Sequence, residues 1–133
     1  MIFVDTGAFL ARYLVRDQYH DRAVAGWEGI ARDGLRCFTS NFVLDETLTL
    51  LGRWAGHAFA AERARLMFSS RVLTILRPGR EEEVEALQDF VRCADQKVSY
   101  TDCISFVLMR ANKLKRAFGF DQHFRMAGFE LLG

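Results

Sequence analysis

Short apolar runs alternate along the chain with longer segments whose apolar residues recur every three or four positions. The runs at residues 2–4, 36–39, 72–76, 117–120 and 129–132 predict strands. The longer segments predict helices over residues 8–15, 21–31, 42–54, 58–68 and 80–93, a further helix ending near residue 111, and a helical turn at 122–126. The strands are short apolar runs rather than alternations, as is typical of strands covered on both faces. We therefore expect an α/β fold: one domain over residues 1–133, with a parallel sheet between helices.

Polar residues at the segment ends predict where the helices begin and stop. Asn41 is a favoured N-cap residue for the helix over 42–54, and Gly56 suits its end. Ser99 and Thr101 are both candidates for the cap of the helix that ends near residue 111.

The charge balance and the cysteines narrow the class of protein. The 133 residues include 18 Lys and Arg and 17 Asp and Glu, a net charge of +1, which excludes a strongly basic binder but not a local basic patch. Cys37, Cys93 and Cys103 form no C-x-x-C pair, which favours reduced thiols in a cytoplasmic protein. No apolar run approaches the roughly 18 residues that a membrane span needs, so no membrane association is expected.

Four acidic residues stand where carboxylates can meet. Asp5 and Asp121 each follow a predicted strand, which puts them at the carboxyl edge of a parallel sheet, where α/β folds bind ligands. Glu46 lies on a mostly apolar helix face, and Asp102 lies at the start of a helix. Each also has a structural alternative: a helix cap for the two strand-end acids, a buried ion pair for Glu46, and a favourable helix-dipole position for Asp102.

Carboxylates that converge stay ionised together only with a cation among them, because each raises the pKa of the others. All-oxygen ligands select Mg²⁺ or Mn²⁺ rather than zinc. Such an ion commonly binds a substrate phosphate and assists attack by water. The acid set therefore predicts metal-dependent phosphoryl chemistry.

Four segments follow one another in the order of a known set of motifs. They are I-F-V-D-T-G-A-F, V-L-D-E-T-L-T-L-L, V-S-Y-T-D-C-I-S-F-V-L-M-R and F-G-F-D-Q-H-F, and they span nearly the whole chain. The first is weak alone, whereas the middle two and the D-x-H-F ending are specific in combination. Together they resemble the PIN-domain family, most closely the VapC-type toxins of bacterial and archaeal toxin–antitoxin systems.

The resemblance implies a PIN-like three-layer α/β/α sandwich with about five parallel strands. It also implies a metal-dependent endoribonuclease whose catalytic and metal-binding residues match Asp5, Glu46, Asp102 and Asp121. In that family Mg²⁺ or Mn²⁺ is bound by the aspartates, Glu46 would orient water or a second ion, and cleavage of RNA leaves a 5′-phosphate and a 3′-hydroxyl. Family members are usually homodimers held inactive by a cognate antitoxin whose tail covers the acidic cleft.

The sequence departs from the family pattern next to the acids. Gly7 and Gly119 replace residues that often carry a hydroxyl, although Thr6 supplies one beside Asp5. Relatives often have another acid before the S-x-x-D motif. Asp95 is the candidate for it here, but Lys97 stands nearer.

Secondary roles beside the four acids have further candidates, which are Thr6, Asp95, Thr101 and His123. His123 lies two residues beyond Asp121, within reach of acid–base chemistry, although orienting the D-x-H-F turn is the simpler role. A basic run is a candidate contact for the RNA backbone, and its alternative is a solvated helix C-terminus. The run consists of Arg110, Lys113, Lys115 and Arg116.

Two other functions compete with the nuclease. The tetrapeptide D-T-G-A at Asp5 resembles the active-site motif of aspartic proteases, but that fold is almost all β, whereas this sequence predicts mostly helices. The other is a catalytically silent PIN scaffold that binds RNA or a protein partner. Gly7 keeps this alternative open, and the four intact acids argue against it.

Overall fold

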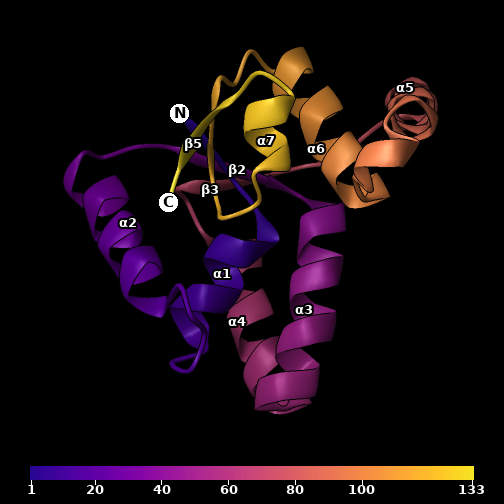
Figure 1. Ribbon diagram of the computed structural model, residues 1–133. Helices are drawn as coiled ribbons and strands as arrows, with labels where there is room; N and C mark the ends of the chain where they lie inside the picture. The colour runs from indigo at the N-terminus through magenta and orange to yellow at the C-terminus, as the bar shows by residue number, and fades with distance from the viewer.

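Five short strands form one parallel sheet in the computed structural model, which covers residues 1–133 (Figure 1). They are β1 (Ile2–Val4), β2 (Cys37–Ser40), β3 (Leu73–Leu76), β4 (Arg116–Phe118) and β5 (Glu130–Leu132). The order β3-β2-β1-β4-β5 puts β1 at the centre. The chain builds outward from β1 to β3 and then returns to the other side of β1, so the winding reverses between β1 and β4. Open α/β sheets bind ligands at such a reversal, beyond the carboxyl ends of the strands.

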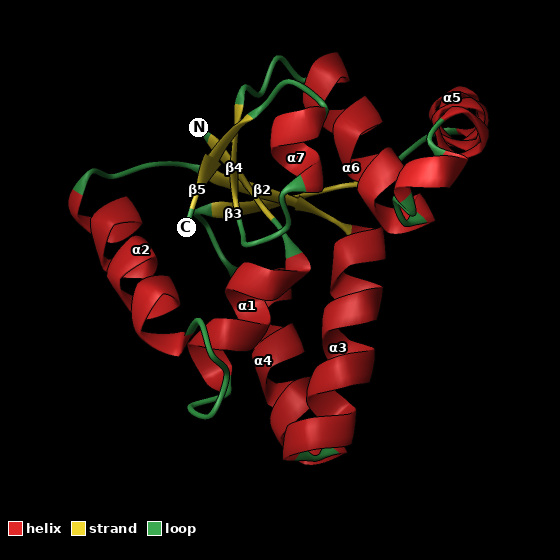
Figure 2. Ribbon diagram, in the orientation of Figure 1, coloured by secondary structure: helices red, strands yellow, loops and turns green.

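Helices connect the strands because parallel neighbours need long crossovers. They are α1 (Thr6–Tyr13), α2 (His20–Arg32), α3 (Asn41–Ala55), α4 (His57–Ser69), α5 (Arg80–Arg92), α6 (Tyr100–Ala111) and α7 (His123–Met126), with a 3₁₀ turn, η1, at Ala94–Gln96. Figure 2 shows α6 and α7 above the strands and α1, α3 and α4 below them, while α5 stands apart from the sheet and packs against α6. The predicted α/β fold with a five-stranded parallel sheet is confirmed.

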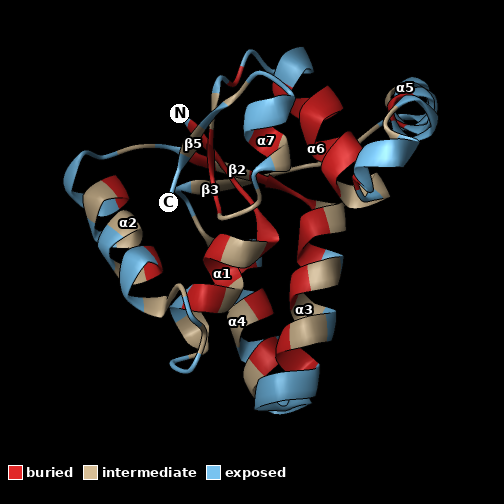
Figure 3. Cartoon of the chain, in the orientation of Figure 1, coloured by how far each residue is buried: buried red, intermediate tan, exposed pale blue.

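The core joins the central strand to α6 and α7. All of β1 is buried, and α6 is buried without interruption over residues 102–109 (Figure 3). Phe106 of α6 packs edge to face on Phe124 of α7, with the ring centroids 5.1 Å apart. The ring centroids of Phe124 and of Phe3 in β1 lie 6.4 Å apart. These contacts hold the starts of α6 and α7 close to the end of β1, which is where the acidic residues lie.

Two predicted helix starts are wrong. α1 begins at Thr6, two residues early, because Asp5 already has the extended backbone of an N-cap; the helix also ends two residues early. Ser40 rather than Asn41 caps α3, since its Oγ accepts the N–H of Val43 at 3.0 Å. Asn41 is therefore the first residue of the helix.

The fourth strand is shorter than predicted. It ends at Phe118, and a bend at Gly119 and Phe120 separates it from Asp121. Glycine suits this bend because a Cβ at position 119 would lie 3.0 Å from the Cβ of Asp5. Asp121 therefore does not directly follow the strand, although it still lies beyond its carboxyl end.

The fold excludes one of the competing functions. Five short strands among seven α-helices exclude the almost all-β fold of an aspartic protease. The cysteines are all free, with Cys37 and Cys103 buried. None of the helices has the length and apolar character to cross a membrane.

We predict that Gly26 of α2 cannot be replaced by alanine without loss of stability. A methyl group there would lie 2.6 Å from Cζ of Phe118, whose ring is fully buried. Gly26→Ala should lower the free energy of unfolding by about 1–3 kcal/mol, the usual effect of overpacking.

The matched control is Gly29→Ala on the same helix, measured like Gly26→Ala by urea unfolding. Its methyl group would meet only the flexible end of Arg32, at 3.4 Å. The higher helix propensity of alanine, worth up to about 1 kcal/mol, should therefore outweigh this contact and stabilise the Gly29→Ala variant. Stabilisation of both variants would contradict the prediction.

Candidate active site

Asp5 begins the site at the end of the central strand. Its N–H donates to the carbonyl of Phe118 at 2.9 Å, which ties it to β4. It occupies the N-cap position of α1, yet its side chain makes no capping hydrogen bond. The carboxylate is buried and its Oδ1 has no hydrogen-bond partner. Capping therefore does not explain this side chain, because a buried and unpaired carboxylate oxygen is costly unless a cation compensates it.

Asp121 approaches from the other side of the reversal in the sheet. Its Oδ1 accepts the N–H of His123 at 2.9 Å, which forms a local turn that starts α7. The cap position of α7 is nevertheless Gln122, so the capping alternative is wrong for Asp121. The side chain is half-buried and lines the same cleft as Asp5.

Helices α6 and α3 supply the other two acids. Asp102 lies in the first turn of α6, where Ser99 caps the helix by accepting the N–H of Asp102 at 3.1 Å. Its side chain is buried, unlike an acid that merely complements the helix dipole from solvent. Glu46 of α3 is half-buried and takes part in no salt bridge, so the ion-pair alternative is wrong. Its neighbour Asp45 is exposed.

A cleft of about 470 Å³ collects all four carboxylates. Burial is the main cause that raises the pKa of Asp5 to about 7, with smaller contributions from the charges of Asp121 and Glu46. Burial, and then the charge of Asp5, raises the pKa of Asp102 to about 9. The protein alone therefore does not compensate this concentration of negative charge.

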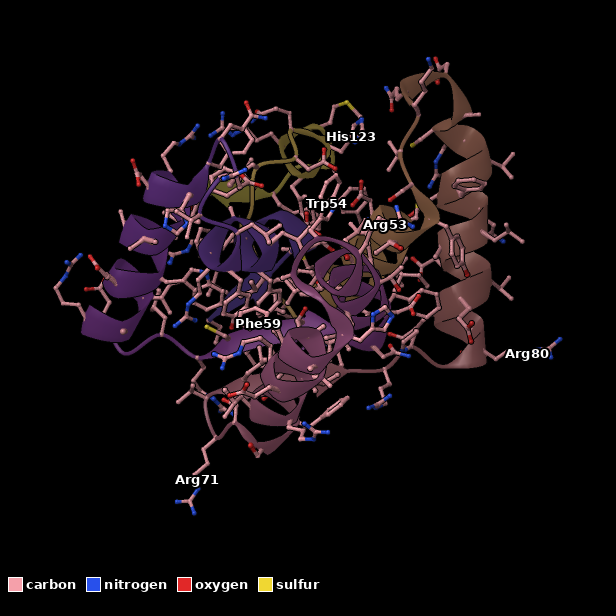
Figure 4. The ribbon with its side chains drawn as sticks, turned by 90° about the horizontal axis from the view of Figure 1, so that it is seen from below. Arg53, Trp54, Phe59, Arg71, Arg80 and His123 are labelled. Atoms are coloured by element: carbon pink, nitrogen blue, oxygen red, sulfur yellow. The ribbon has the colours of Figure 1, made fainter.

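The donor atoms fit a divalent metal ion. Ligand atoms of Asp102, Asp121 and His123 lie within 4.8 Å of one another. Asp5 adds a buried carboxylate oxygen without a partner. In the view from below, His123 is labelled at the upper end of the molecule, on α7, whereas Arg80 points from α5 into solvent (Figure 4). These residues can hold a cation, and carboxylate-rich sites favour hard ions.

Of the candidates for a secondary role, some line the cleft and others lie outside it. Thr6 lines the cleft, and its buried hydroxyl has no hydrogen-bond partner. Thr101 lies outside the cleft lining, and Ser99 is the cap of α6. Asp95 is exposed on η1 and also lies outside the cleft lining.

The basic run lies away from the carboxylates. Arg110 donates to Asp89 at 2.8 Å, so a carboxylate of α5 already engages it. Lys113 and Lys115 precede β4 and Arg116 begins it, whereas the cleft lies beyond the carboxyl end of that strand. None of the four lines the cleft, so an RNA contact by this run would use a separate surface.

Two features of the cleft escaped the sequence reasoning. Lys97 is the one Lys or Arg in the cleft lining, and its backbone is left-handed, with φ 56°. Tyr19 and Phe120 stack in the cleft wall with centroids 4.4 Å apart and 4° between the ring planes. Lys97 and Phe120 lie close to the motifs in the sequence, which is only a weak indication that they line the cleft. No feature of the sequence indicates that Tyr19 lines the cleft, because only the tertiary fold brings its loop there.

Comparisons with known proteins agree with this geometry. The PIN domain family matches residues 2–130. The 23S rRNA-specific endonuclease VapC20 of Mycobacterium tuberculosis is 36% identical over 129 residues, which cover 97% of this chain and 95% of that protein. A VapC ribonuclease of Archaeoglobus fulgidus is 36% identical over 115 residues, or 84% of this chain and 72% of the relative.

Solved structures extend the likeness to the fold. The crystal structure of VapC20, described as a toxin that cleaves the sarcin–ricin loop, matches with a TM-score of 0.87 and 35% identity over 97% of this chain and 96% of that one. VapBC2 of Rickettsia felis matches over 98% and 97% of the two chains, with a TM-score of 0.71 and 12% identity, and shows the fold alone.

The fold and the acidic cleft define a PIN domain, and the chain belongs to the PIN-domain family. Within it, the chain belongs to the VapC ribonucleases of toxin–antitoxin systems.

The raised pKa values predict how the stability of the metal-free protein depends on pH. In the unfolded chain both acids have a pKa near 3.8, so between about pH 4 and the native pKa the folded state binds more protons. The free energy of unfolding should therefore fall as pH rises across this range. Asp102→Asn removes part of this effect and should stabilise the metal-free protein at pH 8 by about 2 kcal/mol or more, and by less at pH 5.

Urea unfolding in EDTA at the two pH values tests this prediction. Asp45→Asn, an exposed acid on α3, is the control and should change stability by less than about 0.5 kcal/mol. A stability difference between Asp102→Asn and wild type that is the same at pH 5 and pH 8 would contradict the assignment.

Proposed function

We propose that this chain is a metal-dependent endoribonuclease that hydrolyses RNA phosphodiester bonds with Asp5, Glu46, Asp102 and Asp121. One observation carries the proposal: carboxylates from four separate elements meet in one cleft at the reversal of the sheet. Two of them are buried without a neutralising Arg or Lys. A substrate that brings further negative charge can enter such a site only with a cation.

The four acids divide between two proposed roles. Asp5, Asp102 and Asp121 hold Mg²⁺ or Mn²⁺, directly or through water. When bound, the ion polarises water and stabilises charge on the phosphoryl oxygens. Glu46, half-buried and free of ion pairs, orients the attacking water and takes its proton. In-line attack on phosphorus then breaks the bond to the 3′ oxygen, which takes a proton from water, and leaves a 5′-phosphate and a 3′-hydroxyl.

The proposed substrate is the sarcin–ricin loop of 23S rRNA. The support is the relative VapC20, which is named for cleavage of this RNA and shares 36% identity with nearly the whole chain. A looped RNA suits an open cleft, because its unstacked nucleotides can leave the helix and reach the carboxylates. This substrate implies action in the cytoplasm.

A cognate antitoxin and a second copy of the chain are the proposed protein partners. Family membership supports both. Large apolar side chains are also exposed on three helices: Trp54 is 70% exposed, Phe68 59% and Val91 68%. Exposed apolar surface of this kind favours protein–protein contacts.

Metal-dependent cleavage is the first test. We predict that the antitoxin-free protein cuts a sarcin–ricin loop RNA in Mg²⁺ or Mn²⁺ and stops in EDTA. The double variant Asp5→Asn, Asp102→Asn should lose metal binding in calorimetry and at least about 10³-fold in cleavage rate, because it removes the ion's charge stabilisation. Asp95→Asn is the matched control and should stay within about twofold of wild type, since Asp95 lies outside the cleft lining.

The outcomes separate the nuclease from the silent scaffold. Metal binding without cleavage of the loop or of a mixed RNA pool would favour a scaffold that binds RNA or protein. Absence of metal binding by the wild type would contradict the carboxylate site itself.

We further propose that Lys97 contacts the RNA phosphate in the cleft. It is the one Lys or Arg in a cleft that otherwise concentrates negative charge. Its left-handed backbone, φ 56°, is that of the C-cap of η1, where its N–H donates to the carbonyl of Ala94. A lysine supplies a compact positive charge that phosphate groups bind.

Lys113 offers a matched comparison, because its φ is also positive, 57°, and it precedes β4, at the opposite end of that strand from the cleft. Lys97→Gly and Lys113→Gly each remove one charge and relieve the same strain, so their effects on stability should agree within about 1 kcal/mol. Cleavage should fall about tenfold or more for Lys97→Gly alone, because it loses a charged contact. An equal loss in both variants would instead indicate that the basic run contacts the RNA.

A further inference from the structure

The ring of His123 is held between a backbone carbonyl and two of the acids. Its Nε2 lies 3.0 Å from the carbonyl oxygen of Gln96 in η1. Its Nδ1 lies 3.0 Å from Oδ1 of Asp121 and 3.6 Å from Oδ2 of Asp102. The ring therefore crosses from the η1 segment to the centre of the acidic cleft.

The contact with Gln96 decides which nitrogen carries hydrogen. A carbonyl oxygen only accepts hydrogen bonds, so Nε2 must donate its hydrogen to it. In the neutral ring Nδ1 then carries a lone pair. A hydrogen bond to the outer nitrogen is also the usual way in which proteins orient a histidine that binds a metal through the other one.

The surroundings of Nδ1 call for a cation. Nδ1 is buried and has no hydrogen-bond partner, although a carboxylate oxygen of Asp121 lies 3.0 Å away. A lone pair that faces two carboxylate groups is repelled by them unless a proton or a metal ion lies between the atoms. Asp5 contributes a second buried atom without a partner to the same cleft. Two buried donor atoms of different chemistry therefore lack a partner in the same cleft.

We propose that Nδ1 of His123 is a direct ligand of the metal ion, so that the site has three carboxylates and one imidazole. The proposal deepens the proposed function, because it names a fourth ligand for the same ion. It assigns His123 to neither of its earlier roles, acid–base chemistry or orientation of the turn. An imidazole nitrogen favours transition metals over Mg²⁺, so the site should prefer Mn²⁺.

Pulsed electron paramagnetic resonance on the Mn²⁺-loaded protein tests the bond directly, because a coordinated imidazole adds a ¹⁴N modulation to the echo. We expect this modulation in the wild type and its loss in His123→Ala. His57→Ala is the matched control and should keep it, since the exposed His57 lies at the start of α4 outside the cleft. A wild-type protein labelled with ¹⁵N-histidine should also lose the ¹⁴N signal, which keeps the test valid if His123→Ala does not fold.

Metal affinity gives the second measurement. Calorimetry should show at least a tenfold weaker affinity for Mn²⁺ in His123→Ala and a smaller loss for Mg²⁺. Equal weakening of both ions would mark His123 as a positioning residue and overturn the proposal. So would an absent ¹⁴N signal in the wild type, or one that persists in His123→Ala.

The result is independent of RNA cleavage. A Mn²⁺-loaded protein with the nitrogen signal but no nuclease activity would keep His123 as a ligand while the proposed function fails. Cleavage without the nitrogen signal would keep the nuclease and remove this ligand. Failure of the wild type to bind Mn²⁺ would overturn both.

Discussion

Burial of carboxylates beside one another is the constraint on which the cleft depends. Asp5 and Asp102 are almost inaccessible to water, and the charge of Asp5 adds to the burial that raises the pKa of Asp102. Neither acid has an Arg or Lys in a salt bridge. Without a cation the folded protein therefore stabilises their protonated forms, whereas a divalent ion would restore their charge. The same imbalance that lowers the stability of the metal-free protein at high pH prepares the site for an ion and for a phosphate.

The rest of the fold keeps these acids together against their repulsion. The N–H of Asp5 bonds to β4, and the glycine at position 119 lets that strand's continuation approach Asp5 closely. Ser99 caps α6 at Asp102, and the buried body of α6 holds this end in place. Burial of apolar surface in α6 and β1 thus offsets the unfavourable charge at their ends, as is common when strained functional sites stand on rigid elements.

Much of the fold followed from local pattern. The strand at residues 2–4 was recognisable because a strand covered on both faces is apolar throughout. Errors arose where neighbouring residues compete for one role. Ser40 and Asn41 are both good caps, and only the backbone of the folded chain selects Ser40. The end of β4 was overextended because Gly119 and Phe120 continue an apolar run, whereas the approach to Asp5 bends the chain there.

The sequence by itself determined the class of fold and the four acids, because each acid stands beside a strand end or on a helix whose pattern is local. The tertiary structure alone decided which side chains share the cleft with them. It brings Lys97 and the ring of His123 to the carboxylates, and it leaves the basic run at the opposite end of β4. The physical reason is that the contact of His123 with Gln96 spans 27 positions along the chain. Such contacts depend on how helices pack across the sheet, and no local pattern of residues records that packing.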